Sequence, residues 1–430
     1  MAEPAPGLRR WWSSWLRPTC VVGSAALLVA ACLPGDSGDP PGSPTTAPRS
    51  VPWQPVPLPG DTDDRRALIR DLTWCAGDWY AVGADVTVDG VTSPAVWHST
   101  DGSRWRRLAA TGHTHYGRLN ILTAAACRDG RLAAIGSMSG GAHGNPRTSS
   151  WQQRPDGTVV EVSAGFELFG GPAAVNVGRI AAGPQGWLIV GNRIGGAAVW
   201  LSAEADRFDI VEDEPGLASD DEGRTWAHDA VADAGGWLVA GAIGRPGRTD
   251  RDPMLWRSVD GRHWRRLPVA GGPANEELHR LAMAGDTAVA AGQRGEVFGA
   301  WRGGDDGWRQ TGTFGSTDGT GVPMVRSLVA DGDRIVAVTT TGATWRLWYS
   351  TDGSRSWHEL TAPTAMPASA DQVAVVAAGG GQLLILVDDA SSVRAWRWWL
   401  DQPRSMSPGR PHASTRRSVR RTTAPARGGA

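Results

Sequence analysis

Residues 95–102 read Ala95-Val96-Trp97-His98-Ser99-Thr100-Asp101-Gly102, a short apolar run that ends in a turn signal. Leu255–Gly261 and Leu347–Gly353 repeat this pattern. The tryptophan of the run recurs at steps of 54, 49, 56, 45, 47 and 48 residues, as Trp97, Trp151, Trp200, Trp256, Trp301, Trp348 and Trp396. Self-similarity at a period of about 50 residues is typical of a repeat architecture.

Each repeat contains four short strand-like segments. A second apolar segment precedes the tryptophan run and often ends in glycine, as in Trp79–Gly83 and Trp187–Gly191. A third lies further upstream, as in Ile121–Ala125, and a fourth follows the turn, as in Trp105–Leu108. Four strands in such a period form one β-propeller blade, which buries its faces against neighbouring blades. The sequence therefore predicts an all-β fold, a seven-bladed β-propeller of four-stranded blades over residues 51–400.

The last repeat supplies only three strands before a proline-rich tail. The missing fourth pattern occurs near the other end of the chain, where Trp53-Gln54-Pro55-Val56-Pro57 resembles Trp264–Pro268. Proline is tolerated on an edge strand, where its absent N–H is not needed for pairing. We therefore expect residues 51–58 to form the outer strand of the last blade and to close the ring.

Three turns, at Ser99–Trp105, Ser258–Trp264 and Ser350–Trp357, resemble the Asp boxes (bacterial-neuraminidase repeats) of sialidase-like propellers. In such a turn the aspartate accepts hydrogen bonds from nearby backbone N–H groups and glycine takes the left-handed position. Ser219–Trp226 matches the motif as well, but it lies before the innermost strand of the fourth repeat. We expect it to be a connecting loop.

The resemblance implies an arginine triad, a tyrosine nucleophile backed by glutamate, and an aspartate acid/base. No residue of this sequence transfers cleanly to those roles. Arg179-Ile180 and Arg334-Ile335 lack the following proline of the family's Arg-Ile-Pro motif, and Tyr116 lies too early in the chain. No catalytic residue is therefore assigned, and binding is the expected function.

The first 31 residues are predicted to be a lipoprotein signal peptide. Arg9, Arg10 and Arg17 precede an apolar stretch from Val21 to Ala31, which is too short for a membrane-spanning helix. The residues before Cys32 resemble a bacterial lipobox, so Cys32 is the expected lipidation site, carrying palmitate-type acyl chains. Residues 32–50 are expected to form a flexible tether, and 401–430 a disordered basic tail. An ordinary secretory signal is the alternative.

The composition limits the possible partners. The formal net charge is −1, which gives no general attraction to nucleic acid. All 43 basic residues are arginine, a bias typical of actinobacterial-type proteins, so chemistry that needs a lysine is excluded.

The second-to-third-strand loops and the connections between blades should share one face, around the central channel. We expect a ligand-binding face there, formed by His113, His115, Tyr116, Arg118, His143, Arg147, Arg245, Arg248, Asp250, Glu276, Glu277 and Arg294. The histidines 113, 115 and 143 could instead bind a metal, but no metal or cofactor is expected. Asp250 with Glu276 or Glu277 could serve a glycoside hydrolase.

Cys75 and Cys127 occupy corresponding positions in consecutive repeats. They could form a disulfide in an exported protein, or remain free thiols. Taken together, the sequence predicts a monomeric lipoprotein on the extracytoplasmic face of the cell membrane. Its expected function is binding or scaffolding for an envelope protein or glycan; a sialidase-like or other glycoside hydrolase is the alternative.

Overall fold

The computed structural model describes residues 47–58, 64–140, 146–304, 307–317, 321–342, 344–367, 369 and 371–400. The predicted signal peptide, the predicted lipidation site Cys32, the tail 401–430 and the candidate residue His143 lie outside these ranges. Among the described residues, no helix has the length and apolar character needed to cross a membrane.

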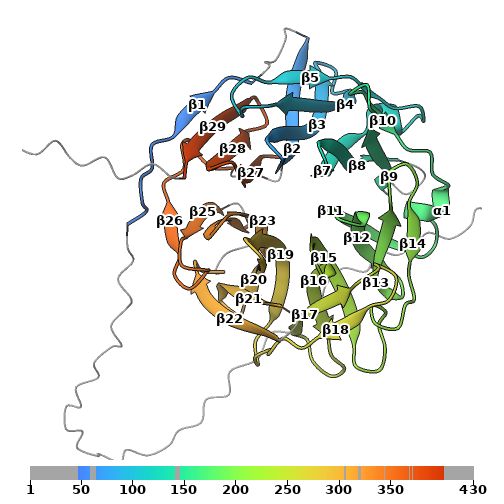
Figure 1. The fold of residues 1–430 in the computed structure, drawn as a ribbon, viewed down its shortest axis with the longest axis vertical. Coiled ribbons are helices and arrows are strands. Elements are labelled where there is room, and N and C mark those ends of the chain that lie inside the picture. The colour runs from blue at the N-terminus through green and yellow to red at the C-terminus, as the bar shows by residue number, and fades with distance from the viewer. Residues whose placement is uncertain are drawn as a thin grey trace, which may run out of the picture. The chain divides into compact units, whose positions relative to one another are not determined.

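Seven antiparallel sheets surround a central axis, so the predicted seven-bladed β-propeller is confirmed (Figure 1). Blade 1 contains β2 Arg65–Cys75, β3 Asp78–Thr87, β4 Thr92–Ser99 and β5 Arg106–Leu108. Blade 2 contains β7 Ile121–Arg128, β8 Arg131–Ser139, β9 Pro146–Gln153 and β10 Val159–Glu161. Blade 3 contains β11 Ala174–Gly183, β12 Gly186–Arg193, β13 Gly196–Ser202 and β14 Asp209–Val211. Blades 4 and 5 contain β15 Arg224–Asp233, β16 Gly236–Gly244, β17 Arg251–Ser258 and β18 Arg265–Leu267; and β19 Glu276–Ala284, β20 Thr287–Arg294, β21 Val297–Gly304 and β22 Gly307–Phe314. Blades 6 and 7 contain β23 Pro323–Asp331, β24 Arg334–Thr341, β25 Thr344–Ser350 and β26 His358–Leu360; and β27 Val373–Gly379, β28 Gln382–Asp388 and β29 Val393–Trp399, completed by β1 Gln54–Val56.

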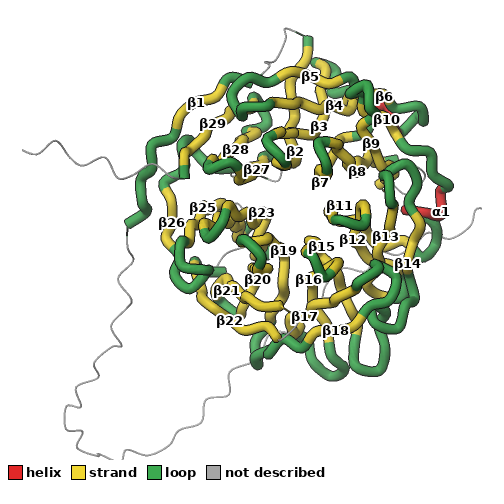
Figure 2. The backbone as a smooth tube through the Cα atoms, viewed as in Figure 1, coloured by secondary structure: helices red, strands yellow, loops and turns green. Residues whose placement is uncertain are grey.

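Three small elements were not predicted. The strand β6 (Ala110–Thr111) pairs in parallel with β10 and gives blade 2 a fifth strand. The 3-10 helix η1 (Gly117–Leu119) and the helix α1 (Phe166–Phe169) lie in connections between blades (Figure 2).

The core is divided among the interfaces between blades. The buried apolar side chains of the described residues form seven clusters, and each cluster joins two adjacent blades. The repeated tryptophans all lie on third strands; Trp151, Trp200 and Trp256 are fully buried there. Burial of large flat side chains between sheets is the main favourable term for a fold whose blades have no core of their own.

The predicted ring closure is confirmed. Pro55 faces Trp396 and Val56 faces Ala395 in the antiparallel pairing of β1 with β29. The same segment also reaches blade 6, where Arg49 N donates to Glu359 O at 2.7 Å. The N-terminal strand thus contacts two blades, one more than the sequence indicated.

The innermost strands share an irregularity that matters for the channel. In blades 1 to 6, the register between the first and second strands shifts by one residue near the middle of the first strand. The extra residues are Arg70, Thr123, Gly178, His228, His279 and Arg326. Bulges of this kind redirect side chains, and they occur often beside functional sites.

Candidate functional site

One group of predicted loop residues gathers over blade 2. His113 N donates to Glu161 at 2.9 Å, and Arg118 donates to His113 O at 2.9 Å. The rings of His115 and Tyr116 meet edge to face at 5.1 Å. Most of this group is therefore occupied in holding the loop together.

Glu161 is the centre of that loop. It also accepts hydrogen bonds from Thr114 N, Thr114 Oγ1 and Ser149 Oγ. Burial raises the pKa of this carboxyl, but the hydrogen bonds outweigh burial and lower it. Because four donors saturate the charged form, Glu161 is a structural acceptor and cannot act as an acid near neutral pH.

A second group of predicted residues lies over blades 4 and 5. Arg245 donates to Asp252 at 2.7 Å, and Arg248 forms ion pairs with both Asp250 and Asp252. The hydrogen bond from Arg248 lowers the pKa of Asp250. These charges neutralise one another within one loop.

The two glutamates of β19 have opposite environments. Glu276 is buried and 3.3 Å from Arg294; burial raises its pKa, and the nearby Asp252 adds to the rise. Glu277 binds Arg251 at 2.9 Å and His228 at 3.3 Å, and these contacts outweigh burial to lower its pKa to about 2. Asp250, Glu276 and Glu277 each lie beside an arginine, and among the described residues no hydrogen bond joins Asp250 to either glutamate.

The central channel holds charged residues that the sequence analysis did not propose as a site. A cavity of about 590 Å³ is lined by residues of six innermost strands. Four arginines line it, Arg70, Arg179, Arg280 and Arg326, together with Asp71 and Trp345. Each arginine lies at the bulge or directly after it.

Two of these arginines have carboxylate partners. Arg70 donates to Asp388 at 2.8 Å, and Arg179 lies 3.1 Å from Asp71. Asp71 also accepts a hydrogen bond from Ala125 N at 2.9 Å, which links blade 1 to blade 2. These two ion pairs join residues of different blades, blade 1 to blade 7 and blade 3 to blade 1.

Among the described residues, Arg280 and Arg326 have no carboxylate within ion-pair distance. Arg280 donates to the carbonyl oxygens of His279 and Arg326, whereas Arg326 donates to Thr340 Oγ1 and lies over the ring of Trp345. Burial lowers the pKa of both side chains, that of Arg280 to about 10, so both remain cations at neutral pH. Here the channel presents two cations that no carboxylate of the described residues contacts directly, beside an aromatic ring; Asp229 and Asp71 attract Arg280 only from a longer distance.

These arginines could have been found from the sequence by one signal. A charged side chain inside an apolar innermost strand, as in Leu68-Ile69-Arg70-Asp71-Leu72, breaks the expected pattern. Arg179 lies in a segment that the sequence predicts to be a strand, whereas the predicted ligand-binding residues lie in loops. The arginines reach the channel at or directly after the bulges of blades 1, 3, 5 and 6, and the sequence did not reveal the bulges.

The alternative role of histidines 113, 115 and 143 as metal ligands stays a prediction, because His143 lies outside the described residues. Among the residues that the structure covers, no group of three or more His, Cys, Asp or Glu side chains could hold a metal ion. His113 contacts Ser163 Oγ at 3.0 Å instead.

The opposite face carries the Asp-box turns. Asp101, Asp260 and Asp352 each accept two backbone N–H bonds from their own turn, and these bonds contribute to lowering the pKa of each carboxyl. Ser219–Trp226 is, as expected, a connection that leads into β15.

Blade 3 has a degenerate turn of the same kind, which the Asp-box motif does not predict. Ser202–Phe208 follows the third strand, with Glu204 at the aspartate position and Ala205 at the glycine position. Ala205 has a φ of 61°, close to the 70° of Gly102. Glu204 binds Arg131 of blade 2 at 2.6 Å instead of its own turn.

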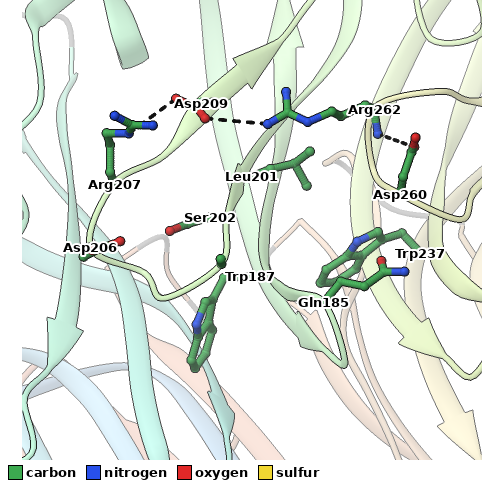
Figure 3. Close-up of a pocket in the computed structure, with 11 residues that line it drawn as sticks. Gln185, Trp187, Leu201, Ser202, Asp206, Arg207, Asp209, Trp237, Asp260 and Arg262 are labelled. Atoms are coloured by element: carbon green, nitrogen blue, oxygen red, sulfur yellow. Dashed lines mark hydrogen bonds and ion pairs between the residues drawn. The ribbon is translucent and has the colours of Figure 1, made fainter.

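A hollow of about 470 Å³ lies beside this turn, between blades 3 and 4 (Figure 3). Arg207 and Arg262 approach Asp209 from opposite sides, at 3.7 and 3.6 Å. Trp187 and Trp237 line it but are almost fully buried. The exposed arginines of this hollow therefore have a carboxylate partner in Asp209, whereas Arg280 and Arg326 of the channel have none among the described residues.

No family model and no curated protein matches the sequence. Solved structures with a similar fold include an endosialidase of phage phi92, at 11% identity and a TM-score of 0.45, covering 85% of this chain and 71% of that one. The propeller domain of the Trilobed protease from Pyrococcus furiosus gives 9% identity, a TM-score of 0.46 and coverages of 81% and 99%. A puromycin-hydrolyzing peptidase of Mycobacterium tuberculosis has 14% identity and a TM-score of 0.45, and the match covers 79% of this chain and 52% of that one.

Proposed function

We propose that this protein is a lipid-anchored binding module on the extracytoplasmic face of the membrane, and that it binds an acidic glycan in the central channel. The observation that carries the proposal is the pair Arg280 and Arg326, which line a cavity of about 590 Å³ and have no carboxylate of the described residues within ion-pair distance. An acidic group entering the channel would gain charge-assisted hydrogen bonds at both. Trp345 beside Arg326 offers an apolar face for a sugar ring.

The hydrolase alternative is less well supported. Asp250 and Glu277 are ion-paired with arginines, and the pKa of each is lowered. A general acid would need the opposite shift. Only Glu276 has a raised pKa, and its side chain is buried against Arg294.

Binding can be tested with polygalacturonate and its methyl-esterified form, which differ only in charge. We expect the acid to bind, the ester not to bind, and added salt to weaken the complex. The double variant R280Q/R326Q should lose at least about tenfold in affinity. The control R106Q/R309Q removes the same charge from exposed outer strands and should bind as the wild type does.

Equal binding of acid and ester, or equal affinity of the two double variants, would contradict the proposal. Turnover of fluorogenic glycosides that is abolished in E276Q or D250N would instead establish the hydrolase alternative.

A further inference from the structure

A second cavity, of about 580 Å³, lies between blades 2 and 3 and shares Thr123 and Gly178 with the wall of the channel. It opens where the bulged position carries a small side chain. In blades 1, 4, 5 and 6 the same position is arginine or histidine, but in blades 2 and 3 it is Thr123 and Gly178. The space between these two innermost strands is therefore left unfilled.

The lining of this cavity is mostly apolar or small. Ile135, Val175, Val177, Phe166 and Phe169 contribute apolar side chains. Phe166 is 58% exposed and Val175 is 39% exposed. Both line the cavity, so a ligand bound there would cover part of their apolar surface. Pockets of a few hundred cubic ångströms with an apolar lining and few polar groups are typical of small-molecule sites.

Arg147 is the charged group of the cavity wall. Its guanidinium lies 4.6 Å from the ring centroid of Phe166 and 5.7 Å from that of Tyr116. Its Nε is buried and has no hydrogen-bond acceptor, and no carboxylate of the described residues lies within ion-pair distance. Glu161, which lines an adjoining hollow with Arg147, is saturated by its four donors.

We propose that this cavity binds a small carboxylate with an aromatic body. The aromatic body would cover Phe166 and Val175, and the carboxylate would accept hydrogen bonds from Arg147, whose guanidinium the two rings hold in place. A neutral ligand would offer Arg147 only an uncharged acceptor such as a carbonyl oxygen, and such a hydrogen bond is weaker than one to a carboxylate. This site goes beyond the proposed function because it uses none of the unpaired channel arginines.

The test compares N-acetyl-phenylalanine with N-acetyl-phenylalanine amide, which differ only in the carboxylate. Calorimetry with the wild-type chain should show binding of the acid at least about tenfold tighter than that of the amide. R147Q should remove this difference. R154Q is the matched control, since Arg154 is an exposed residue of the same blade, outside the cavity, and it should keep the difference.

Two further measurements separate the possible outcomes. A peptide ending in phenylalanine shows whether the carboxylate of the ligand can be the C-terminus of a chain. If the peptide binds as well as N-acetyl-phenylalanine, the site is supported and the ligand is a peptide end. If N-acetyl-phenylalanine alone binds, the site is supported and the ligand is a small metabolite. T123F, which fills the cavity from the channel side, should abolish binding of the acid. Failure of the wild type to bind either acid, equal affinity for acid and amide, or full binding by T123F would overturn the proposal. R280Q/R326Q should bind the acid normally, so the failure of one proposal is distinguishable from that of the other.

Discussion

The carboxylate of Asp352 accepts hydrogen bonds from four atoms of its own turn. It accepts hydrogen bonds from Arg355 N, Ser356 N and Ser350 Oγ through one oxygen, and from Ser356 Oγ at 2.6 Å through the other. Partial burial opposes ionisation, but these bonds outweigh it and lower the pKa of Asp352 to about 2. The residue therefore accepts hydrogen bonds from its own turn, as the Asp-box resemblance predicts.

Replacing Asp352 with alanine should destabilise the fold by about 1 kcal/mol, because two backbone N–H groups lose their acceptor. Urea unfolding measures this change. D333A removes an exposed aspartate from another turn and should have almost no effect. Equal unfolding midpoints for the two variants would show that the turn does not need its carboxylate.

His279 has a different effect at the residue scale, because it is buried and neutral. Its Nδ1 accepts a hydrogen bond from Val325 N at 3.1 Å, and burial together with nearby His228 lowers its pKa to about 3. In the unfolded chain the same imidazole titrates near pH 6.5. Between these two values the unfolded state binds more protons, so stability falls as the pH falls.

We expect H279Q to flatten the dependence of the unfolding free energy on pH between 6.5 and 4. One histidine contributes a slope of up to about 1.4 kcal/mol per pH unit in that window. H358Q, at an exposed histidine of β26, should keep the wild-type slope. Parallel pH profiles for H279Q and the wild type would contradict this account.

At the scale of the strand, the sequence predicted more of the fold than of the site. Strand positions followed from Trp97 and its six counterparts because burial between blades imposes the same residue type in every repeat. The bulges at Arg70, Gly178 and Arg326 leave no such trace, since a register shift depends on the pairing of two strands. Arg248 and Glu277 were both predicted to lie in loops that face a ligand, but Glu277 lies in β19, and both side chains form ion pairs, Arg248 with Asp250 of its own loop and Glu277 with Arg251.

Cys75 and Cys127 join the ends of two innermost strands. They form a disulfide with a Cα–Cα distance of 5.9 Å, across 52 residues of sequence. It links the end of β2 in blade 1 to the end of β7 in blade 2. The two chain segments therefore stay close together when the protein unfolds.

Reduction of this disulfide should destabilise the protein by about 3–4 kcal/mol, because the cross-link limits the unfolded chain. Guanidinium unfolding with and without dithiothreitol measures the loss. The double variant C75A/C127A should unfold near the midpoint of the reduced wild type and should not respond to dithiothreitol. A response of that variant as large as the wild-type response would assign the effect to another cause.

At the scale of the whole molecule, the ring is closed by three residues of β1. Val56 is buried in the cluster that joins blades 7 and 1, and Gln54 meets Arg397 across the last sheet. The proline-containing pattern at Trp53 predicted this pairing, because an edge strand is one of the few places in a sheet that tolerates proline. The contact of Arg49 with blade 6 had no counterpart in the sequence pattern.

Removal of residues 1–58 should lower the free energy of unfolding by at least about 2 kcal/mol, since it exposes the apolar surface that Val56 covers and leaves β29 unpaired. Thermal unfolding followed by circular dichroism measures this. A chain that begins at residue 46 retains β1 and is the control. The interpretation fails if both truncated chains melt together.

The position of β1 also determines when the protein can be completed. Gln54 is among the earliest structured residues to be synthesised, yet its partner Arg397 follows 343 residues later. Until then the first-made strand has nothing to pair with, and the outward surface of blade 1 has no neighbour. Closure of the ring therefore requires pairing between segments from the two ends of the propeller sequence, a non-local step of the kind that folds slowly, and an incomplete chain exposes apolar surface that favours aggregation.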